Sequence, residues 1–508
     1  MSRLGVGGGR DITRLLADFG HDLPAVPAPP APAREPRLFR HVPRRGARRA
    51  GRGWAPAGAP VSTWRMTSDQ APAFWPFVAT PGLPPTGAQM GIDLLSGGSF
   101  YADPLGWVLR DDVPVTNPNV FCFGKPGTGK SGTVKAFCLR MAEFGYRTLV
   151  VGDPKDEYEP LCRFFGVQPF VIGPGMPARI NPLAFGPLAQ GWDRLDGPAA
   201  RGRAAIVFSR WLTLVRGLVG SQRIGERRVP FGPTDEVVVK AALGALTGYT
   251  AGHTRMIETT IPALWHLLDN PTDELVTQCR YASPRHFLDQ TRLLRDALGQ
   301  LVSGALAGLF DDHTSIDVDW SAPIQSLSLS RLEPLGEEAV GIALTCLNSW
   351  GRGMREMAAP GDLRIVVRDE SWKQLRLGLE AVKSFDADLR LSRGVAGRGG
   401  DIQLAVAHKP SDLLSAGDAG SQAATIAKDL LHLADVKILH GQQDAIAGEL
   451  DTMLGLGPIA RDLITGWAMQ AKGRVLWCVG EQTYKVATQL HPAEHTLTFT
   501  NEAIKGAA

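Results

Sequence analysis

The chain contains the stretch Gly124-Lys-Pro-Gly-Thr-Gly-Lys130-Ser131, which matches the Walker A pattern. An apolar run, Val120–Phe123, precedes it, and residues 132–144, with helical spacing, follow it. This order of strand, glycine-rich loop and helix is the setting that the motif requires. The alternative, a glycine-rich turn before an ordinary helix, does not explain the match at every fixed position. The stretch therefore predicts a loop that binds the phosphates of a nucleoside triphosphate.

Each residue type in this loop has a physical role. Gly124, Gly127 and Gly129 allow backbone angles and close approaches that a Cβ would block. The loop amides and the N-terminus of the following helix attract an anion. We expect Lys130 to reach the β- and γ-phosphates and the Ser131 hydroxyl to bind Mg²⁺. The expected nucleotide-binding positions are Gly124, Lys125, Pro126, Gly127, Thr128, Gly129, Lys130, Ser131 and Gly132.

Length and composition place the chain among globular proteins. Its 508 residues suffice for two or more domains, and 44% hydrophobic and 21% charged residues are typical of soluble folds. The six cysteines include no C-x-x-C pair, so neither a zinc site nor a disulfide framework is expected. The longest apolar stretch, residues 204–220, is interrupted by Arg210 and Arg216. With no signal peptide at the start, we expect a cytoplasmic protein, at most peripheral to the inner face of the cell membrane.

Charge is distributed unevenly along the chain. Residues 1–65 contain twelve arginines and four acidic residues, so this part carries +8 while the whole chain carries +3. Residues 1–75 are also rich in proline, alanine and glycine, which predicts a disordered basic tail. Such a tail suits contact with nucleic acid or an anionic membrane, but a solvated tail without a partner fits the same composition.

The remainder predicts an α/β fold. Short apolar runs that end in turn residues alternate with helical segments, which indicates a mostly parallel sheet covered on both faces. Residues 192–309 instead show helical spacing without strands, with helices at 199–219, 235–246, 254–268 and 284–306. The predicted division is a tail over 1–75, a first core part with Walker A over 76–190, an all-α insertion over 191–310 and a second core part over 311–508.

A second motif follows the insertion. The apolar strand Leu363–Arg368 ends at Asp369-Glu370, as in the Walker B pattern. There the aspartate holds Mg²⁺ and the glutamate orients the attacking water. Any strand can end at two surface acids, but the carboxyl end of a central strand, together with a Walker A loop, favours the Walker B interpretation. Arg393 and Arg398, in a glycine-rich loop, are candidates for an arginine that acts across a subunit boundary, although many such arginines are only solvated.

The order of motifs resembles a known family. After the P loop come VVGDPKDEYEPL (150–161), RINPLAF (179–185), GLFDD (308–312), DESW (369–372) and SDLL (411–414). This succession, over about residues 85–490, resembles the TraC-like conjugative ATPases of type IV secretion systems, in the HerA–FtsK division of P-loop ATPases. The resemblance implies a RecA-like core with a helical insertion and Mg²⁺-dependent ATP hydrolysis between the subunits of a homo-hexamer. It also implies partners in the secretion machinery at the inner membrane, with DNA contacts through the tail or the hexamer pore.

The chain departs from this family at three places. A short basic tail stands where the family has a large N-terminal domain. Arg368 occupies a usually apolar position, and it either faces a polar layer or pairs with an acid. His408 stands where the family has a glutamine that senses the γ-phosphate; imidazole can still donate one hydrogen bond, but a structural role fits equally. The candidate catalytic residues are Lys130, Glu370, His408, Arg393 and Arg398, with Ser131 and Asp369 as metal ligands.

Three functions fit this sequence. The first is an ATPase motor that drives conjugative transfer or type IV secretion of DNA or protein. The second is a soluble HerA- or FtsK-like DNA translocase, whose DNA binding would fall steeply with salt. The third is a nucleotide-responsive scaffold with little turnover, which Arg368 and His408 favour.

Overall fold

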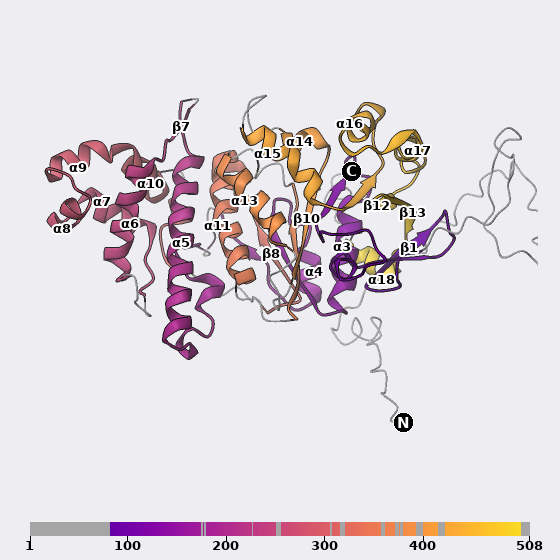
Figure 1. Cartoon of the computed structure of the whole chain (residues 1–508), viewed down its shortest axis with the longest axis horizontal. Helices are drawn as coiled ribbons and strands as arrows, with labels where there is room; N and C mark the ends of the chain where they lie inside the picture. The colour runs from indigo at the N-terminus through magenta and orange to yellow at the C-terminus, as the bar shows by residue number, and fades with distance from the viewer. Residues whose placement is uncertain are drawn as a thin grey trace, which may run out of the picture. The chain divides into compact units, whose positions relative to one another are not determined.

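An 11-stranded sheet forms the centre of the fold (Figure 1). The computed structural model describes residues 82–498, except 174–175, 177–178, 226, 250–255, 305–306, 315–320, 357–360, 371–374, 376–378, 393–399 and 415–421. The strand order is β2-β1-β13-β12-β11-β3-β10-β9-β4-β8-β5. Neighbours from β11 to β5 are parallel, and those from β2 to β11 are antiparallel. The predicted α/β class is confirmed, while the predicted tail lies outside the described residues.

Residues of the parallel strands are almost all buried, because helices cover both faces of the sheet. Their sequences are accordingly near-continuous apolar runs, such as VFCF in β3. The parallel part consists of β3 (Val120–Phe123), β4 (Tyr146–Asp153), β5 (Phe170–Val171), β8 (Ile324–Ser328), β9 (Leu363–Arg368), β10 (Gly400–Ala407) and β11 (Val436–His440). The antiparallel part consists of β1 (Ala88–Asp93), β2 (Ser99–Ala102), β12 (Arg474–Val479) and β13 (Gln482–Thr488).

Alternate residues of the strands face two separate cores. Val120 and Cys122 pack in one core with the P-loop helix, whereas Phe121 and Phe123 face the other. The first face is covered by α2 (Pro104–Val108), α3 (Lys130–Ala142), α4 (Glu159–Phe164) and α18 (Pro492–Thr498). The second is covered by α11 (Glu337–Glu356), α13 (Leu379–Arg390), α14 (Pro410–Leu414), α15 (Gln422–Leu430), α16 (Asp444–Leu454) and α17 (Gly457–Asp462).

The predicted helical insertion differs from the expectation in several details, among them the additional short helix over 273–278. It comprises α5 (Gly197–Ser221), α6 (Pro233–Thr247), α7 (Ile261–Asp269), α8 (Asp273–Gln278), α9 (Pro284–Gln290) and α10 (Arg292–Ser303). The absence of strands was wrong: β6 (Arg223–Ile224) and β7 (Arg227–Arg228) pair around Gly225, whose φ of 63° permits the tight turn. The helix expected over 254–268 begins at Ile261, because the Thr260 side chain caps it. The helix expected over 284–306 is two helices that meet at Thr291.

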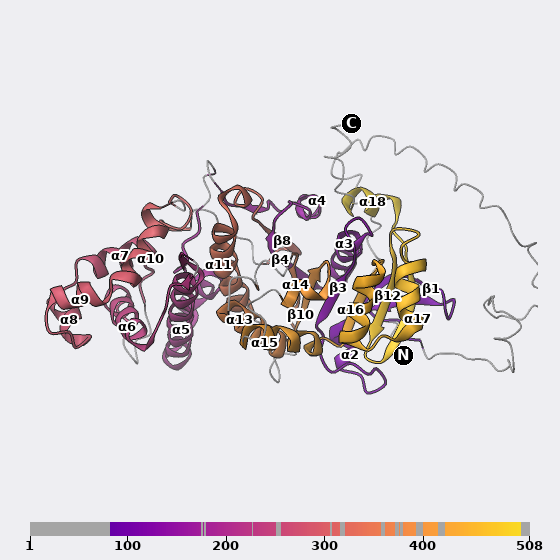
Figure 2. The same cartoon turned by 90° about the horizontal axis from the view of Figure 1, so that it is seen from above.

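Helix α5 lies beside α11 at the junction between insertion and core (Figure 2). By length and composition alone, this helix could cross a membrane. That is weak evidence, since the core helix of a soluble protein passes the same test. Its Val207, Trp211, Leu214 and Leu218 are buried in a core that α11 shares. The two arginines that interrupt its apolar sequence also make contacts within the protein, with Ser349 and with Glu236.

Candidate nucleotide-binding site

The P loop has a backbone that requires glycine. Gly127 and Gly129 have φ values of 83° and 101°, which side chains with a Cβ rarely adopt. A Cβ added at Gly124 would lie 2.5 Å from the Cβ of His440. The loop therefore holds its shape through glycines at the three predicted positions, and Gly129 forms the N-cap of α3.

Lys130 is the first residue of α3, and its ammonium lies inside the loop. Its Nζ donates to the Gly124 carbonyl oxygen at 2.6 Å and lies 3.2 Å from Nδ1 of His408. Burial lowers the pKa of Lys130. The ammonium is thus withdrawn from bulk water at the point where the loop would receive phosphate oxygens.

The two acidic residues after β9 form a strained turn. Glu370 has a φ of 50°, and a non-glycine residue in this region costs on the order of 1–3 kcal/mol. Its Oε1 lies 2.9 Å from Nζ of Lys155 and 3.4 Å from Nε2 of His408. Burial alone would raise the pKa of Glu370, but the hydrogen bonds from His408 and Lys155 outweigh it and lower that pKa. Glu370 is therefore ionised at neutral pH.

His408 links the two motifs. Its Nδ1 accepts from Lys130, and its Nε2 faces the Glu370 carboxylate, so one neutral tautomer satisfies both contacts. The candidate sensor thus lies between the ammonium of Walker A and the carboxylate of Walker B. Gln442 fixes it from behind, because its Nε2 donates to the His408 carbonyl oxygen at 2.7 Å.

Asp369 lies among other carboxylates, and the nearby Lys130, Lys135 and Lys155 offset their effect only in part. Burial, and then the carboxylates of Glu157, Glu370 and Asp153, raise the pKa of Asp369 to about 7. A cation would relieve this crowding, and a hydroxyl such as that of Ser131 with a carboxylate is a ligand set that Mg²⁺ accepts. Among the described residues, no group of three or more His, Cys, Asp or Glu could hold a metal alone. That fits Mg²⁺, which takes remaining ligands from water and phosphates.

One cavity of about 640 Å³ brings most of these residues together. It is lined by Pro126, Gly127, Gly129, Lys130, Ser131, Gly132, Lys155, Glu157, Asp369, Glu370 and His408, among others. The cavity is not lined by Gly124, Lys125 or Thr128, which shape the loop instead. The Lys125 amide donates to the Gly441 carbonyl oxygen, and the Thr128 hydroxyl donates to the Lys125 carbonyl oxygen. Arg393 and Arg398 lie outside the described residues.

One part of the cavity wall was not expected from the sequence. Lys472 and Gly473, which precede β12, line it with Thr488, Leu490 and His495, which lie in or after β13. The Gly473 amide donates to the Thr128 carbonyl at 3.2 Å, so this segment also contacts the P loop. No local motif marks these residues, because only the antiparallel extension of the sheet brings them to the site. Lys155 and Glu157 lie within a recognised motif, but no role was predicted for them.

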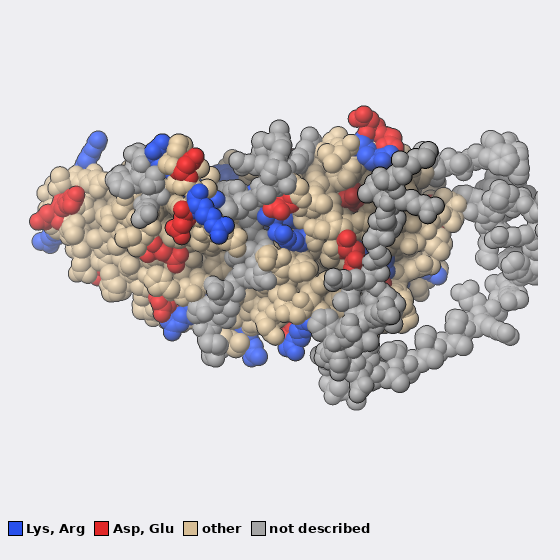
Figure 3. Space-filling view, turned by 90° about the horizontal axis from the view of Figure 1, so that it is seen from below, with Lys and Arg blue, Asp and Glu red and all other residues tan. Residues whose placement is uncertain are grey.

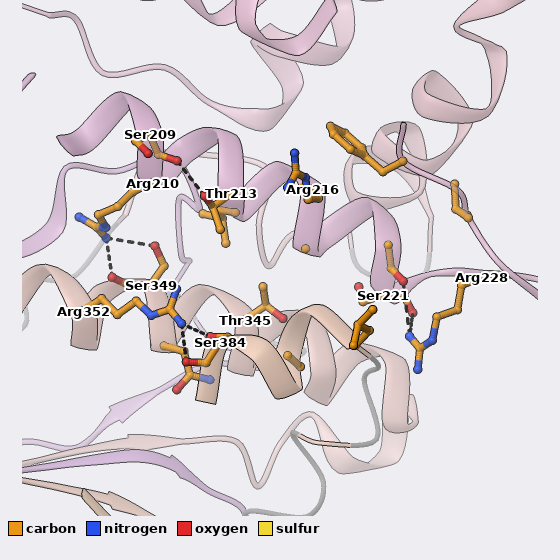
Figure 4. A pocket seen from close by; sticks show the side chains of 18 of the residues that line it. Ser209, Arg210, Thr213, Arg216, Ser221, Arg228, Thr345, Ser349, Arg352 and Ser384 are labelled. Carbon is orange, nitrogen blue, oxygen red and sulfur yellow. Dashed lines mark hydrogen bonds between the residues drawn. The ribbon is translucent and has the colours of Figure 1, made fainter. Parts of the chain in front are cut away.

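A second cavity, of about 670 Å³, lies between α5, α11 and α13 (Figure 4). Arg210 and Arg352 extend from its walls toward Ser349 and Ser384, respectively. Although it is slightly larger, it contains no residue of either Walker motif. The first cavity is therefore the candidate nucleotide-binding site.

Comparison with solved structures identifies the fold. VirB4 of Thermoanaerobacter pseudethanolicus has a TM-score of 0.61 at 20% identity, over 82% of this chain and 100% of that one. The plasmid coupling protein TrwB with ADP and Mg²⁺ has a TM-score of 0.50 at 12% identity, over 80% of this chain and 90% of that one. No family model matches the chain, and no curated protein matches it in sequence. The chain thus shares the fold of VirB4 and TrwB, which confirms, at the level of the fold alone, the resemblance predicted from its motifs.

Proposed function

We propose that this chain is an ATPase motor that energises conjugative transfer or type IV secretion of DNA or protein. The observation that carries the proposal is the contact series Lys130–His408–Glu370, which joins both Walker motifs in one cavity. The fold supports it, since VirB4 and the coupling protein TrwB share the architecture, and TrwB has been solved with ADP and Mg²⁺.

Each residue has a defined task in this proposal. Lys130 and the loop amides bind the β- and γ-phosphates. Ser131 and Asp369 would hold Mg²⁺, which neutralises charge on the phosphate oxygens when bound. The ionised Glu370 orients the attacking water and accepts its proton. His408 contacts both Glu370 and Lys130, and its single Nε2–H would have to turn from the Glu370 carboxylate to the γ-phosphate in order to sense it.

The quaternary organisation belongs to the same proposal. We propose a homo-hexamer with one site per subunit boundary, in which Arg393 or Arg398 of a neighbouring subunit completes the site. The proposed location is the cytoplasm, at the inner face of the cell membrane, beside the secretion machinery. The proposed domain boundaries are those given above, with the insertion over 191–310 between two parts of the core.

Steady-state ATP hydrolysis over a range of protein concentrations tests the motor function. We expect turnover whose rate per subunit rises with concentration, because each site is completed between subunits. Lys240→Ala and Glu274→Gln, exposed positions in the insertion, serve as controls and should match the wild type. Absence of turnover at every concentration, with ATP still bound, would contradict the motor and support the scaffold.

One observation favours the scaffold as a second candidate. Glu370 Oε1 is held at 2.9 Å by Lys155, and a carboxylate so engaged is less able to accept a proton from water. Replacing Lys155 with methionine distinguishes the two candidates. If the protein is a scaffold, neither the wild type nor Lys155→Met should hydrolyse ATP. If it is a motor, the wild type should hydrolyse ATP and Lys155→Met should do so at a different rate.

The DNA-translocase alternative makes a prediction about charge. On the face of the described residues that Figure 3 shows, lysines and arginines lie in small groups interspersed with acidic residues. A continuous basic track would instead indicate DNA binding by the monomer. Stimulation of ATP hydrolysis by DNA would support the translocase, provided that the affinity for DNA also falls on the order of 10³-fold between 50 and 200 mM salt.

A further inference from the structure

Arg368 is the last residue of β9 and directly precedes Asp369, yet it faces the other side of the sheet. Because side chains alternate along a strand, Val366 and Arg368 face α11 and α13, while Val367 faces the P-loop core. Arg368 is only 4% exposed. Its guanidinium lies 2.8 Å from Oδ2 of Asp388 on α13 and donates to Oε1 of Gln403 on β10. The side chain is thus bonded to two neighbouring elements behind the catalytic turn.

The Asp388 carboxylate accepts hydrogen bonds from three arginines. Besides Arg368, its Oδ1 accepts from Nε of Arg352 at 3.0 Å and from Nη1 of Arg355 at 3.2 Å, both on α11. Burial would raise the pKa of Asp388, but these arginines outweigh it and lower that pKa. Arg355 also bonds Oδ2 of Asp401 on β10. One buried carboxylate therefore connects α11, α13 and β9.

This cluster lies behind a backbone that needs support. The positive φ of Glu370 is a strained conformation, and such strain persists only where the surroundings over-determine it. Lys155 and His408 hold the Glu370 carboxylate from the front. Arg368, two residues earlier, holds the chain from behind, with its guanidinium 5.0 Å from the ring centre of Phe385. An apolar residue could fill this space but could not give directional bonds to α13 and β10.

We propose that Arg368 is a positioning residue: its pair with Asp388 fixes the end of β9 and thereby places Asp369 and Glu370 toward Mg²⁺-ATP. This inference rests on the proposed function of the first cavity. The same carboxylate binds Arg352, whose guanidinium also lines the cavity next to α5 and reaches Ser384 (Figure 4). The end of the Walker B strand is therefore tied to the helix on which the insertion packs.

Arg368→Met tests the proposal with little risk to the fold. The unbranched side chain keeps the contact with Phe385, and Asp388 keeps Arg352 and Arg355 as partners. We expect kcat to fall about tenfold to a hundredfold, the cost of a misplaced catalytic group, and more Mg²⁺ to be required for half-maximal rate. Affinity for a fluorescent ATP analogue at saturating Mg²⁺ should change less than about threefold, because the P loop is intact.

Arg364→Met is the matched control. Arg364 is also buried, lies on the same face of β9 and pairs with Asp362, but it is at the far end of the strand from Asp369. We expect its kcat and Mg²⁺ requirement to equal those of the wild type. Equal kcat and equal Mg²⁺ requirement in Arg368→Met and Arg364→Met would overturn the proposal.

A conservative variant covers the case in which Arg368→Met fails to fold. Arg368→Lys keeps the charge but not the two-sided reach to Asp388 and Gln403. Arg368→Lys should have a kcat between those of Arg368→Met and the wild type, and the melting temperature of the wild type. A Mg²⁺ requirement equal to that of the wild type would contradict the proposal. If the wild type itself does not hydrolyse ATP, the proposed function fails instead. The rise in melting temperature with Mg²⁺ and a non-hydrolysable ATP analogue then decides: a smaller rise in Arg368→Met than in Arg364→Met supports the positioning role, and equal rises overturn it.

Discussion

Two polar clusters meet at the end of β9, one on each face of the sheet, and they are built oppositely. In front, Asp369 lies near Glu157 and other carboxylates, and burial and this crowding raise its pKa to about 7. Behind, Asp388 is surrounded by arginines, including Arg352 and Arg368, and its pKa is lowered. The aspartate in front is thus crowded by carboxylates although three lysines lie near it, whereas the aspartate behind is bonded directly by three arginines.

The difference separates a site from its support. A buried aspartate with a raised pKa is costly to ionise in the free protein, and its ionised form becomes favourable when Mg²⁺ and a charged ligand enter. A cluster in which each charged group is bonded to an opposite charge needs no ligand and holds its elements in one arrangement. The front face is therefore where binding is expected, and the back face is where rigidity is expected.

The largest effect on stability should come from the back face. Asp388→Asn leaves the buried Arg368 and the partly buried Arg352 and Arg355 without their shared carboxylate, so we expect a loss of about 3–5 kcal/mol in the free energy of unfolding. Asp386→Asn, two residues earlier on α13, breaks only a more exposed pair with Arg390 and should cost less than about 0.5 kcal/mol. Urea unfolding of both variants measures the contrast; similar losses would mean that the buried cluster is not special.

The same substitution on the front face should have the opposite sign. The folded-state pKa of Asp369, about 7, is above its ordinary value of 3.8, so this group makes the protein less stable as pH rises from about 4 to 7. Asp369 is partly exposed to solvent, which reduces the energy that its pKa shift implies. We therefore expect Asp369→Asn to raise the free energy of unfolding by about 2 kcal/mol at pH 8 without nucleotide. The same variant should lose ATP hydrolysis. The gain in stability should vanish near pH 4. Unfolding at both pH values tests it, and a destabilised variant at pH 8 would contradict the charge assignment.

His440, which lies next to the P loop, should have a smaller effect on stability, and this effect should depend on pH. Burial and then the nearby Lys130 lower the pKa of His440 to about 3, below its ordinary 6.5. The unfolded chain then binds more protons between these values, so stability is lost as pH falls below 6.5. Between pH 7.5 and 5, the wild type should lose about 1–2 kcal/mol more than His440→Gln, measured by urea unfolding. Parallel pH profiles for the two proteins would rule out this role.

The smallest effect is expected from the basic tail. Deletion of residues 1–70 removes no residue of either cluster, so affinity for an ATP analogue should change less than about twofold. The matched measurement is the affinity of the full chain under the same salt. A large loss in the truncated protein would show that the tail contributes to the site.

The parts that were predictable from sequence are those encoded locally. The P loop, the strand before Asp369 and most parallel strands follow from glycine positions and apolar runs within a few residues of one another. The wall formed by Lys472 and His495 depends on β12 and β13 extending the sheet antiparallel, which no short pattern records. The partner of Arg368 lies 20 residues away on another element, so only the fold could show which of its two expected environments applies. It has both: a polar layer and an acid.

The most direct measurement of whether the first cavity is a hydrolytic site compares Glu370→Gln with Lys130→Ala. Both affinity for an ATP analogue and steady-state hydrolysis should be determined. Glu370→Gln should bind the analogue about as tightly as the wild type but lose hydrolysis on the order of a hundredfold or more, because it keeps the P loop and loses the carboxylate. Lys130→Ala should lose both. Wild-type hydrolysis in either variant would show that ATP is cleaved elsewhere, or not by this chain.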